Sequence, residues 1–478
     1  MFDMISNIFN REVSPLNQSV TAFFEEISGK RIAVMGIGVS HIDVIRMLAG
    51  KARAVIACDK REASAFESAL LDEFGALGVE LRLGEGYFDR LDFDILLRTP
   101  GMYFNLPRLS EFRDMGGIVT SEMELFFDLC PCKTIAVTGS DGKTTTTTLI
   151  AEMLKASGKT VHLGGNIGKA LFPEIMKVQP GDFAVVELSS FQLISMRQSP
   201  DIAVITNVEP NHLDVHGDMQ EYTDAKRNLY SHQNAFGIAV LNSDNEVTRS
   251  FVPLLRGQCR MFSLKDKVAG SWLRADGMLC YTDYSGETTE LFNKKDIRLP
   301  GEHNIANYLT AIAAVWGIVP TLYMNEVARV FGGVEHRIEF VRELDSVKWY
   351  NDSIASSPTR SIAGLKAFGK RIVMLAGGYD KKIPYEPLAP YLVKYVRLLI
   401  LMGDTAAKLE AACRADVGYN GDNPVIIHAK DMEEAVQIAR RETSPGDIVT
   451  LSPASASFDH YPNFEVRGRH FKQLVNEL

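Results

Sequence analysis

Short hydrophobic runs alternate with longer amphipathic stretches along the first half of the chain. The runs occupy residues 31–35, 54–57, 93–97, 134–137, 183–188, 202–208 and 238–241. Short apolar runs that are followed by helical periodicity are typical of parallel α/β sheets. The pattern therefore predicts a series of βα units that begins at residue 31.

The pattern changes near residue 258. From there to residue 299 the runs are short and rich in turn residues, which predicts antiparallel hairpins. A helix is predicted over 304–316, because apolar residues recur there at helical spacing. Later strands are predicted at 347–350, 372–375, 398–401, 425–428 and 448–451. The chain is therefore expected to be an α/β protein of three domains, covering residues 1–120, 121–333 and 334–478.

Composition agrees with a soluble globular protein. Of the 478 residues, 46% are hydrophobic and 23% are charged, and no apolar run is long enough for a membrane helix. The N-terminus lacks a basic stretch followed by an apolar one, so we expect a cytoplasmic protein without membrane insertion. The net charge of −9 argues against a nucleic-acid partner. The six cysteines are scattered, which predicts reduced thiols rather than a metal site.

A glycine-rich segment after the run at 134–137 carries the strongest chemical signal. It reads Thr138-Gly-Ser-Asp-Gly-Lys-Thr144 and opens a threonine-rich helix. Such a turn lets backbone N–H groups approach phosphate oxygens, and a helix N-terminus favours negative charge. Two residues separate the glycines, against about four in the general phosphate-loop pattern, so the prediction depends on strand, loop and helix together. Lys143 is expected at the β- and γ-phosphates, and Thr144 at magnesium.

This compact loop resembles that of the Mur ligases and folylpolyglutamate synthetases. Further segments occur in the order that this family has: Gly164-Gly-Asn-Ile-Gly168, Glu187-Leu-Ser-Ser-Phe-Gln192, Asn207-Val-Glu-Pro-Asn-His-Leu-Asp214, Gly301-Glu-His-Asn-Ile-Ala-Asn307 and His336-Arg337. The resemblance extends from about residue 29 to the C-terminus. It implies Rossmann-like N- and C-terminal domains on either side of a central ATPase domain of the phosphate-loop type.

The resemblance also implies a reaction. ATP would phosphorylate a substrate carboxylate, and an amine would then attack the acyl phosphate. This chemistry needs positive charge around the transferring phosphoryl group. The implied catalytic residues are Lys143, Glu187, His212 and Lys226. Two magnesium ions are implied, with Thr144, Glu187, His212 and a carbamylated Lys226 as ligands. On the residues alone, Lys226 would be a solvated lysine on a helix surface.

The implied ATP site extends beyond the loop. It comprises Gly139, Ser140, Asp141, Gly142, Lys143, Thr144, Thr145, Asn304, Asn307, Arg337 and Asp352. Asn304 alternatively caps the helix that it begins. Arg337 and Asp352 match residues that reach ATP from the third domain, which would couple nucleotide binding to domain closure.

The segment Gly36-Ile-Gly-Val-Ser-His41 follows the first strand like a dinucleotide fingerprint, with histidine at the third glycine position. On this motif alone a dehydrogenase stays open. In the D-glutamate-adding Mur ligases the matching region binds the uridine diphosphate of the acceptor, UDP-N-acetylmuramoyl-L-alanine. The residues that this resemblance implies are Ser40, His41, Asp59, Lys60, Arg61, Thr99, Pro100, Gly101 and Asn166.

The C-terminal run, residues 451–471, resembles the D-glutamate-adding members most closely. The implied D-glutamate contacts are Ser356, Lys381, Lys382, Ser457, Phe458 and Phe464. Many family members carry a lysine where this chain has Ile354, so one cation near the anionic substrate is lost. Whether Lys381 or Lys382 binds the substrate carboxylate is left open.

The expected function is therefore ATP-dependent addition of D-glutamate to UDP-N-acetylmuramoyl-L-alanine in peptidoglycan precursor synthesis, by a monomer that acts on small molecules. A family ligase for another amino acid or for folate is the nearest alternative. A nucleotide-dependent switch would release no phosphate in response to an amino acid. A dehydrogenase would bind nicotinamide.

Overall fold

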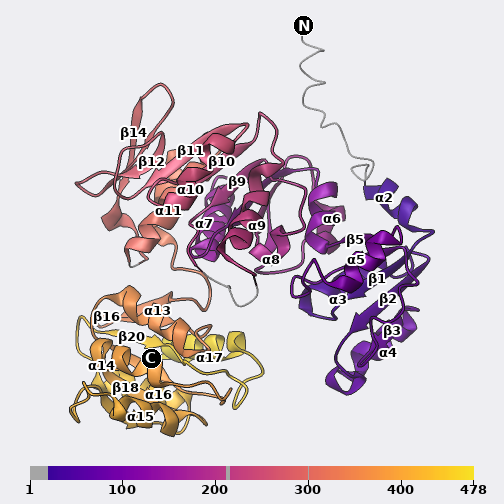
Figure 1. Cartoon of the computed structure of the whole chain (residues 1–478). Coiled ribbons are helices and arrows are strands. Elements are labelled where there is room, and N and C mark those ends of the chain that lie inside the picture. Colours follow the sequence, from indigo (N-terminus) through magenta and orange to yellow (C-terminus); the bar gives the residue numbers. More distant parts are fainter. Residues whose placement is uncertain (1–19, 211–215, 300) are drawn as a thin grey trace. The chain divides into compact units, whose positions relative to one another are not determined.

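The computed structural model describes residues 20–210, 216–299 and 301–478 (Figure 1). Within these ranges the chain forms three sheets and divides into two compact units. The first unit holds the first two sheets and Ala306–Val327, whereas the second, Lys294–Ile305 and Ala328–Leu478, holds the third sheet. The α/β class is confirmed, and the boundaries at residues 120 and 333 stay predictions.

The first sheet has five parallel strands in the order β3-β2-β1-β4-β5. The strands are β1 Arg31–Met35, β2 Ala54–Asp59, β3 Glu80–Leu83, β4 Ile95–Leu97 and β5 Ile118–Thr120. The helices are α2 Val20–Ile27, α3 Val39–Leu48, α4 Ser68–Ala76 and α5 Pro107–Asp114. Because β1 pairs with both β2 and β4, the turns after β1 and β4 meet at a switch in strand order, where open α/β sheets bind ligands.

The second sheet has nine strands in the order β14-β13-β12-β11-β10-β9-β6-β8-β7. They are β6 Lys133–Thr138, β7 Val161–Gly165, β8 Phe183–Glu187, β9 Ile202–Ile205, β10 Ile238–Asn242, β11 Gln258–Ser263, β12 Gly270–Leu273, β13 Met278–Thr282 and β14 Thr288–Asn293. The helices between and after them include α6 Glu122–Leu129, α7 Lys143–Ala156, α8 Ser190–Leu193, α9 Met219–Ser231, α10 Glu246–Ser250, α11 Glu302–Val315 and α12 Thr321–Val330. Strand β6 lies between β8 and β9, so the loop after it opens at a second switch point.

The antiparallel pairing predicted after residue 258 is present in β12, β13 and β14. It is wrong for β11, which runs parallel to both β10 and β12. The chain reaches β11 from β10 through α10 and a 3₁₀ turn, and a crossover of this kind joins parallel strands.

The third sheet has six strands in the order β15-β16-β20-β17-β18-β19, and only the β15–β16 pair is antiparallel. The strands are β15 Glu339–Leu344, β16 Val347–Asn351, β17 Ile372–Ala376, β18 Val396–Leu401, β19 Val425–His428 and β20 Ile448–Leu451. The helices are α13 Pro358–Phe368, α14 Ala389–Tyr395, α15 Ala406–Ala415, α16 Met432–Glu442 and α17 Phe464–Glu477. All five strands predicted for this segment are present.

A continuous hydrophobic core joins the first two sheets. Val34 of β1 and Ala136 of β6 belong to the same buried cluster, and so does Phe23 of α2. The ring of Phe23 packs edge-on against Phe172, with centroids 5.9 Å apart. The third sheet has cores of its own on its faces. None of the helices in the described ranges is long and apolar enough to cross a membrane.

Candidate functional site

The glycine-rich loop between β6 and α7 leaves no space for a side chain at its two glycines unless neighbouring side chains move. Gly142 has φ 77° and Gly139 has φ 152°. A Cβ on Gly139 would lie 1.8 Å from Thr206 Oγ1, and one on Gly142 would lie 2.5 Å from Asn307 Oδ1. Both glycines therefore let the loop approach the segment after β9 and helix α11 closely.

The segment after β9 holds the loop in place. Asn207 Oδ1 accepts hydrogen bonds from the backbone N–H groups of Ser140 (3.0 Å) and Asp141 (2.9 Å). Thr206 Oγ1 donates to the Asp141 carbonyl at 2.5 Å. These two N–H groups are thus already bonded. The N–H groups of the first turn of α7, from Lys143 onward, have no acceptor within the helix and are the ones available to phosphate.

Two lysines converge on one carbonyl oxygen of the loop. Lys143 Nζ donates to Gly139 O (3.0 Å) and Ser140 O (2.9 Å), and Lys226 Nζ also donates to Gly139 O (2.8 Å). Lys226 is 1% exposed and lies over the ring of Tyr222, so the solvated-lysine alternative is wrong. Burial, reinforced by the nearby charge of Lys143, lowers the pKa of Lys226 to about 7.

Glu187 ends β8 beside the phosphate loop, since it is the register partner of Val137 in β6. Its side chain is buried; Oε1 accepts a hydrogen bond from Asn166 Nδ2 (2.9 Å), whereas Oε2 has no hydrogen-bond partner among the described residues. A buried carboxylate oxygen without a donor suits a cation. The hydroxyl-bearing Thr144, also buried, lies in the first turn of α7.

These residues fit magnesium without forming a complete site. The described residues contain no group of three His, Cys, Asp or Glu side chains that could hold a metal ion. His212, predicted as a ligand, lies outside the described residues. Within the described ranges, Glu187 and Thr144 are the predicted ligands whose side chains supply oxygen, and Lys226 would join them only as a carbamate.

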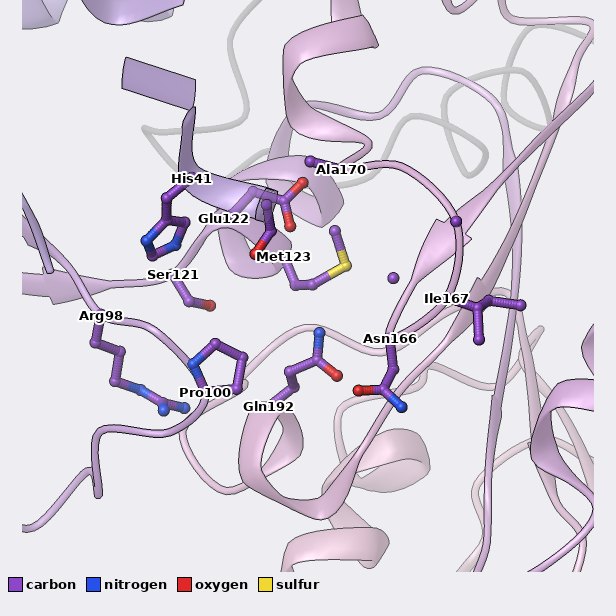
Figure 2. Close-up of a pocket in the computed structure, with 13 residues that line it drawn as sticks. His41, Arg98, Pro100, Ser121, Glu122, Met123, Asn166, Ile167, Ala170 and Gln192 are labelled. Atoms are coloured by element: carbon purple, nitrogen blue, oxygen red, sulfur yellow. The ribbon is translucent and has the colours of Figure 1, made fainter. Parts of the chain in front are cut away.

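A pocket of about 240 Å³ opens between the first two sheets (Figure 2). Figure 2 shows His41 and Ser121 on one side and Asn166 and Ile167 on the other. Four of the residues predicted for the uridine-diphosphate substrate line it: Ser40, His41, Pro100 and Asn166. The other five predicted residues are not part of its lining, namely Asp59, Lys60, Arg61, Thr99 and Gly101.

His41 is a buried ring held by backbone carbonyls. Its Nδ1 lies 2.9 Å from Gly36 O and 3.1 Å from Met35 O. Burial lowers the pKa of His41, and these backbone hydrogen bonds only partly oppose the effect. A neutral ring that donates through Nδ1 therefore forms part of the pocket wall.

Asp59 and Arg61 organise the turn after β1. Asp59 Oδ2 accepts the Ile37 N–H and an Arg61 N–H, both at 2.8 Å, and Arg61 also donates to Ile37 O at 2.8 Å. Burial alone would raise the pKa of Asp59, but hydrogen bonds from Arg61 and Ile37 lower it to about 2. These residues therefore shape the glycine-rich turn beside the pocket, while Lys60 is exposed.

Several lining residues carry polar side chains that the sequence did not identify. They include Arg98, which follows β4 and is 1% exposed, Glu122 of α6, and Gln192 of α8. Glu122 accepts the N–H groups of Leu171 (2.9 Å) and Phe172 (2.7 Å), and burial raises its pKa to about 7. In the sequence, Arg98 directly follows an apolar run, and Gln192 ends the segment Glu187-Leu-Ser-Ser-Phe-Gln192.

In the second unit, the predicted nucleotide ligand Asp352 follows β16 and is 4% exposed. Its carboxylate accepts the Ile338 N–H (3.2 Å) and the Ser452 hydroxyl (3.1 Å). Burial raises the pKa of Asp352 to about 7, against the opposing effect of these bonds and of Arg337. Asn304 and Asn307 are both buried on α11, where Asn304 belongs to this unit and Asn307 to the first.

The residues predicted for D-glutamate lie on loops at the carboxyl ends of β16, β17 and β20, and at the start of α17. Ser457 is buried, whereas Phe458 is 60% exposed with its ring edge-on to Tyr379. Phe464 packs edge-on against His336 at 5.9 Å. Both candidate lysines, Lys381 and Lys382, are exposed.

Arg467 of α17, which the sequence did not identify, joins two of these loops. Its buried guanidinium donates to Ser353 O (2.9 Å), Ala456 O (2.9 Å) and Ser455 O (3.1 Å). The loops after β16 and β20 therefore have a fixed mutual position within this unit.

Comparison with known proteins gives a consistent result. Residues 137–315 match the Mur ligase middle domain, and residues 336–455 match the Mur ligase, glutamate ligase domain. A UDP-N-acetylmuramoylalanine–D-glutamate ligase of Acetivibrio thermocellus is 48% identical over 97% of this chain and 100% of its own length. The ligase of the same name from Clostridium botulinum (strain Hall) is 45% identical over 97% of this chain and 100% of its own length.

Two solved structures have the same fold. A UDP-N-acetylmuramate–alanine ligase from Thermotoga maritima superposes with a TM-score of 0.56 at 17% identity, covering 94% of this chain and 99% of its own. A UDP-N-acetylmuramoyl-L-alanyl-D-glutamate–2,6-diaminopimelate ligase gives 0.54 at 18% identity, covering 95% and 94%. At this identity they show the fold alone, which has Rossmann-like terminal domains around a central ATPase domain.

Proposed function

This chain belongs to the Mur ligase family, and from that membership we propose that it joins D-glutamate to UDP-N-acetylmuramoyl-L-alanine in peptidoglycan precursor synthesis. ATP is used, as throughout the family. We expect it to be split to ADP and phosphate. The observation that carries the proposal is the 45–48% identity, over nearly the whole chain, to ligases named for this reaction. The converging lysines at the phosphate loop support it.

Phosphoryl transfer needs positive charge and oriented donors around the γ-phosphate. Lys143 and the first-turn N–H groups of α7 would bind the phosphates, after Lys143 leaves the loop carbonyls that it now contacts. Magnesium, held by Thr144 and Glu187, would neutralise the phosphate charge. Lys226 would help to place the phosphoryl group, as a carbamate that replaces its cation with an anion.

An unprotonated amine is required for that carbamate. The pKa of about 7 leaves a large fraction of Lys226 neutral at physiological pH, whereas an ordinary lysine is almost fully protonated. Burial of Lys226 thus favours the modification. His212 is carried as a further magnesium ligand by family resemblance only.

The pocket between the first two sheets would hold the acceptor, and its lining residue Asn166 donates a hydrogen bond to Glu187. Asn304 and Asn307 would face the adenine and ribose side of ATP, while Arg337 would contact its phosphate and Asp352 its ribose. D-Glutamate would bind in the second unit through Ser356, Ser457, Phe458, Phe464 and one of the two lysines. We further propose a cytoplasmic monomer whose partners are these small molecules.

The test is phosphate release from ATP in the presence of UDP-N-acetylmuramoyl-L-alanine. We expect D-glutamate to stimulate release, and L-glutamate, lysine or diaminopimelate not to do so. Mass spectrometry should find the ligated product. Stimulation by a different amino acid would overturn the proposed substrate and leave the ligase chemistry intact. Release without any amino-acid response would favour a nucleotide-dependent switch.

A further inference from the structure

The loop after β4, residues 98–103, contributes Arg98 and Pro100 to the pocket and is called the acceptor loop below. We propose that Arg98 and Tyr103 are positioning residues, which tie this loop to α8 and α9 and so set the acceptor carboxylate against the phosphate loop. The inference rests on the proposed function.

Arg98 forms the first tie. Its guanidinium crosses from the first sheet to the segment after β8, where it donates to Phe191 O (2.9 Å) and Ser195 Oγ (2.6 Å). It also donates back to Met102 O within its own loop, at 3.2 Å. Phe191 and Ser195 follow Glu187 by only a few residues. Arg98 therefore fixes one end of the acceptor loop relative to Glu187.

Tyr103 forms the second tie, at the other end of the loop. Its hydroxyl donates to Glu221 Oε1 at 2.6 Å, a short bond to a carboxylate that is 28% exposed. Glu221 lies in the first turn of α9 and also accepts the Gly217 N–H at 3.1 Å. The same helix carries Tyr222 and Lys226. Tyr103 therefore fixes the loop relative to the helix that carries the proposed carbamate.

His216 connects the two ties through direct side-chain contacts. Its Nε2 is 2.9 Å from Ser190 Oγ of α8, and its ring stacks on Phe191 with centroids 5.0 Å apart. On the other side its Nδ1 lies 3.6 Å from Glu221. A chain of contacts thus joins the two ends of the acceptor loop. It runs from Arg98 through Phe191, His216 and Glu221 to Tyr103.

This chain of contacts also extends to the phosphate loop. Tyr222 Oη lies 3.0 Å from Ser140 Oγ, and Ser140 Oγ in turn donates to Glu209 O at 2.9 Å. A displacement of α9 against the acceptor loop would therefore change where the acceptor stands relative to ATP. Reaction needs the attacking and transferring atoms at about 3–3.5 Å, and small misplacements are costly. Breaking a tie should reduce catalysis without removing any group that binds ATP.

The test uses Tyr103→Phe, Glu221→Gln and the double variant, with Ser195→Ala to weaken the Arg98 tie. Tyr103→Phe should lower kcat/KM for the acceptor about tenfold, the loss of one hydrogen bond to a charged group, whereas Glu221→Gln keeps an oxygen that accepts the hydroxyl and should cause a smaller loss. The KM for ATP should change by less than about twofold. Because the two side chains share one hydrogen bond, the double variant should lose little more than Tyr103→Phe alone. Ser195→Ala should show the same pattern with a smaller loss.

Tyr284→Phe is the matched control, because it removes a tyrosine hydroxyl that bonds to Cys259 O on an edge hairpin of the same unit. It should leave all constants unchanged. Losses that multiply in the double variant, or a KM for ATP that rises with that for the acceptor, would overturn the inference.

The proposed function can fail separately. If the unmodified protein shows no D-glutamate-dependent phosphate release, acceptor binding measured by titration calorimetry still tests the ties. Tyr103→Phe should then weaken binding of UDP-N-acetylmuramoyl-L-alanine but not of ATP. Equal acceptor affinity in both proteins would overturn the inference whatever the reaction.

Discussion

At the scale of single residues, burial decides what the chemical groups of this protein can do. Lys226 and Asp352 are both almost inaccessible, and burial moves the pKa of each to about 7 from opposite directions. The amine becomes partly neutral and the carboxyl becomes partly protonated near physiological pH. Each shift gives a measurable consequence.

Lys226→Arg keeps a cation at the phosphate loop but cannot form a carbamate. We expect kcat to fall at least about a hundredfold, the order found when an electrostatic group in a transition state is lost. In the protein without substitutions, lowering the pH below 7 protonates the Lys226 amine, so activity should fall. Added bicarbonate should partly restore that activity. Phosphate-release assays measure both effects. Lys155→Arg, on the exposed side of α7, is the control and should be silent.

Asp352→Asn tests the other shift through stability. The folded pKa of about 7 exceeds the ordinary value of 3.8, so between these pH values the folded state binds more protons than the unfolded state. Stability of the second unit should therefore fall as pH rises from 4 to 7. Asp352→Asn should not lose stability in this way. Its free energy of unfolding at pH 8 should exceed that of the protein without the substitution by about 1–2 kcal/mol.

Denaturant unfolding at pH 5 and pH 8 measures the difference, with exposed Asp422→Asn as the control. The same variant should bind ATP more weakly if Asp352 contacts the nucleotide. An equal midpoint for both proteins at pH 8 would contradict the assigned burial penalty.

At the scale of elements, the phosphate loop and helix α7 combine two separate demands on glycine. Gly142 has both a left-handed backbone and a close neighbour, Asn307 Oδ1 at 2.5 Å from an added Cβ. Gly158, at the other end of the same helix, has a similar φ of 81° with nothing within 4 Å. Substitutions at Gly142 and Gly158 can therefore be compared to separate the effect of backbone strain from that of steric conflict.

Gly158→Ala should cost about 1–2 kcal/mol of stability from the left-handed backbone and leave ATP binding unchanged. Gly142→Ala should cost more, because Asn307 must also move, and should weaken ATP binding at least about tenfold. Thermal unfolding and nucleotide titration give the two numbers. Equal effects of the two variants on ATP binding would show that the contact with Asn307 is unimportant.

The strands that bury continuous apolar runs were predictable, and those with polar or glycine-rich sequences were not. Strands β1, β6 and β17 lie where their hydrophobic runs predict them. Strand β3 reads Glu-Leu-Arg-Leu at a sheet edge, and β7 ends in two glycines, so neither has a strand-like run. Pairing with β2 and β8 makes them strands, and that is a tertiary effect.

The candidate site divides in the same way. The phosphate loop is a local signal, and it could be read directly from residues 138–144. Arg98 could not be found, because its partner Ser195 is 97 residues away in sequence and nothing in either neighbourhood indicates the other. The buried state of Lys226 depends likewise on Gly139, 87 residues earlier.

At the scale of the whole molecule, the sites proposed for the acceptor and for D-glutamate lie in different units. The acceptor pocket and phosphate loop belong to the first unit, and the residues proposed for D-glutamate belong to the second. Variants at the acceptor pocket and at the residues proposed for D-glutamate should therefore affect different Michaelis constants, whereas residues proposed for ATP lie in both units. Michaelis constants can likewise show whether Lys381 or Lys382 binds the substrate carboxylate.

Lys381→Met and Lys382→Met should differ. One of the two lysines is proposed to pair with the substrate carboxylate. Its replacement should raise the KM for D-glutamate at least about tenfold, since a charge-assisted bond is lost. The KM for the acceptor should not change. The other lysine should have little effect. Steady-state kinetics with each substrate varied in turn measures this, and two silent variants would mean that neither lysine binds the substrate.

The antiparallel strands at the edge of the second sheet offer a practical use. Strand β13 is separated from β6 by β12, β11, β10 and β9, which places it roughly 24 Å from the phosphate loop strand at about 4.8 Å per strand. The turn between β13 and β14 is exposed, with Tyr284 61% accessible. A fluorophore attached at that turn would lie at a distance suited to energy transfer from a labelled nucleotide, and would report occupancy of the active site without touching it.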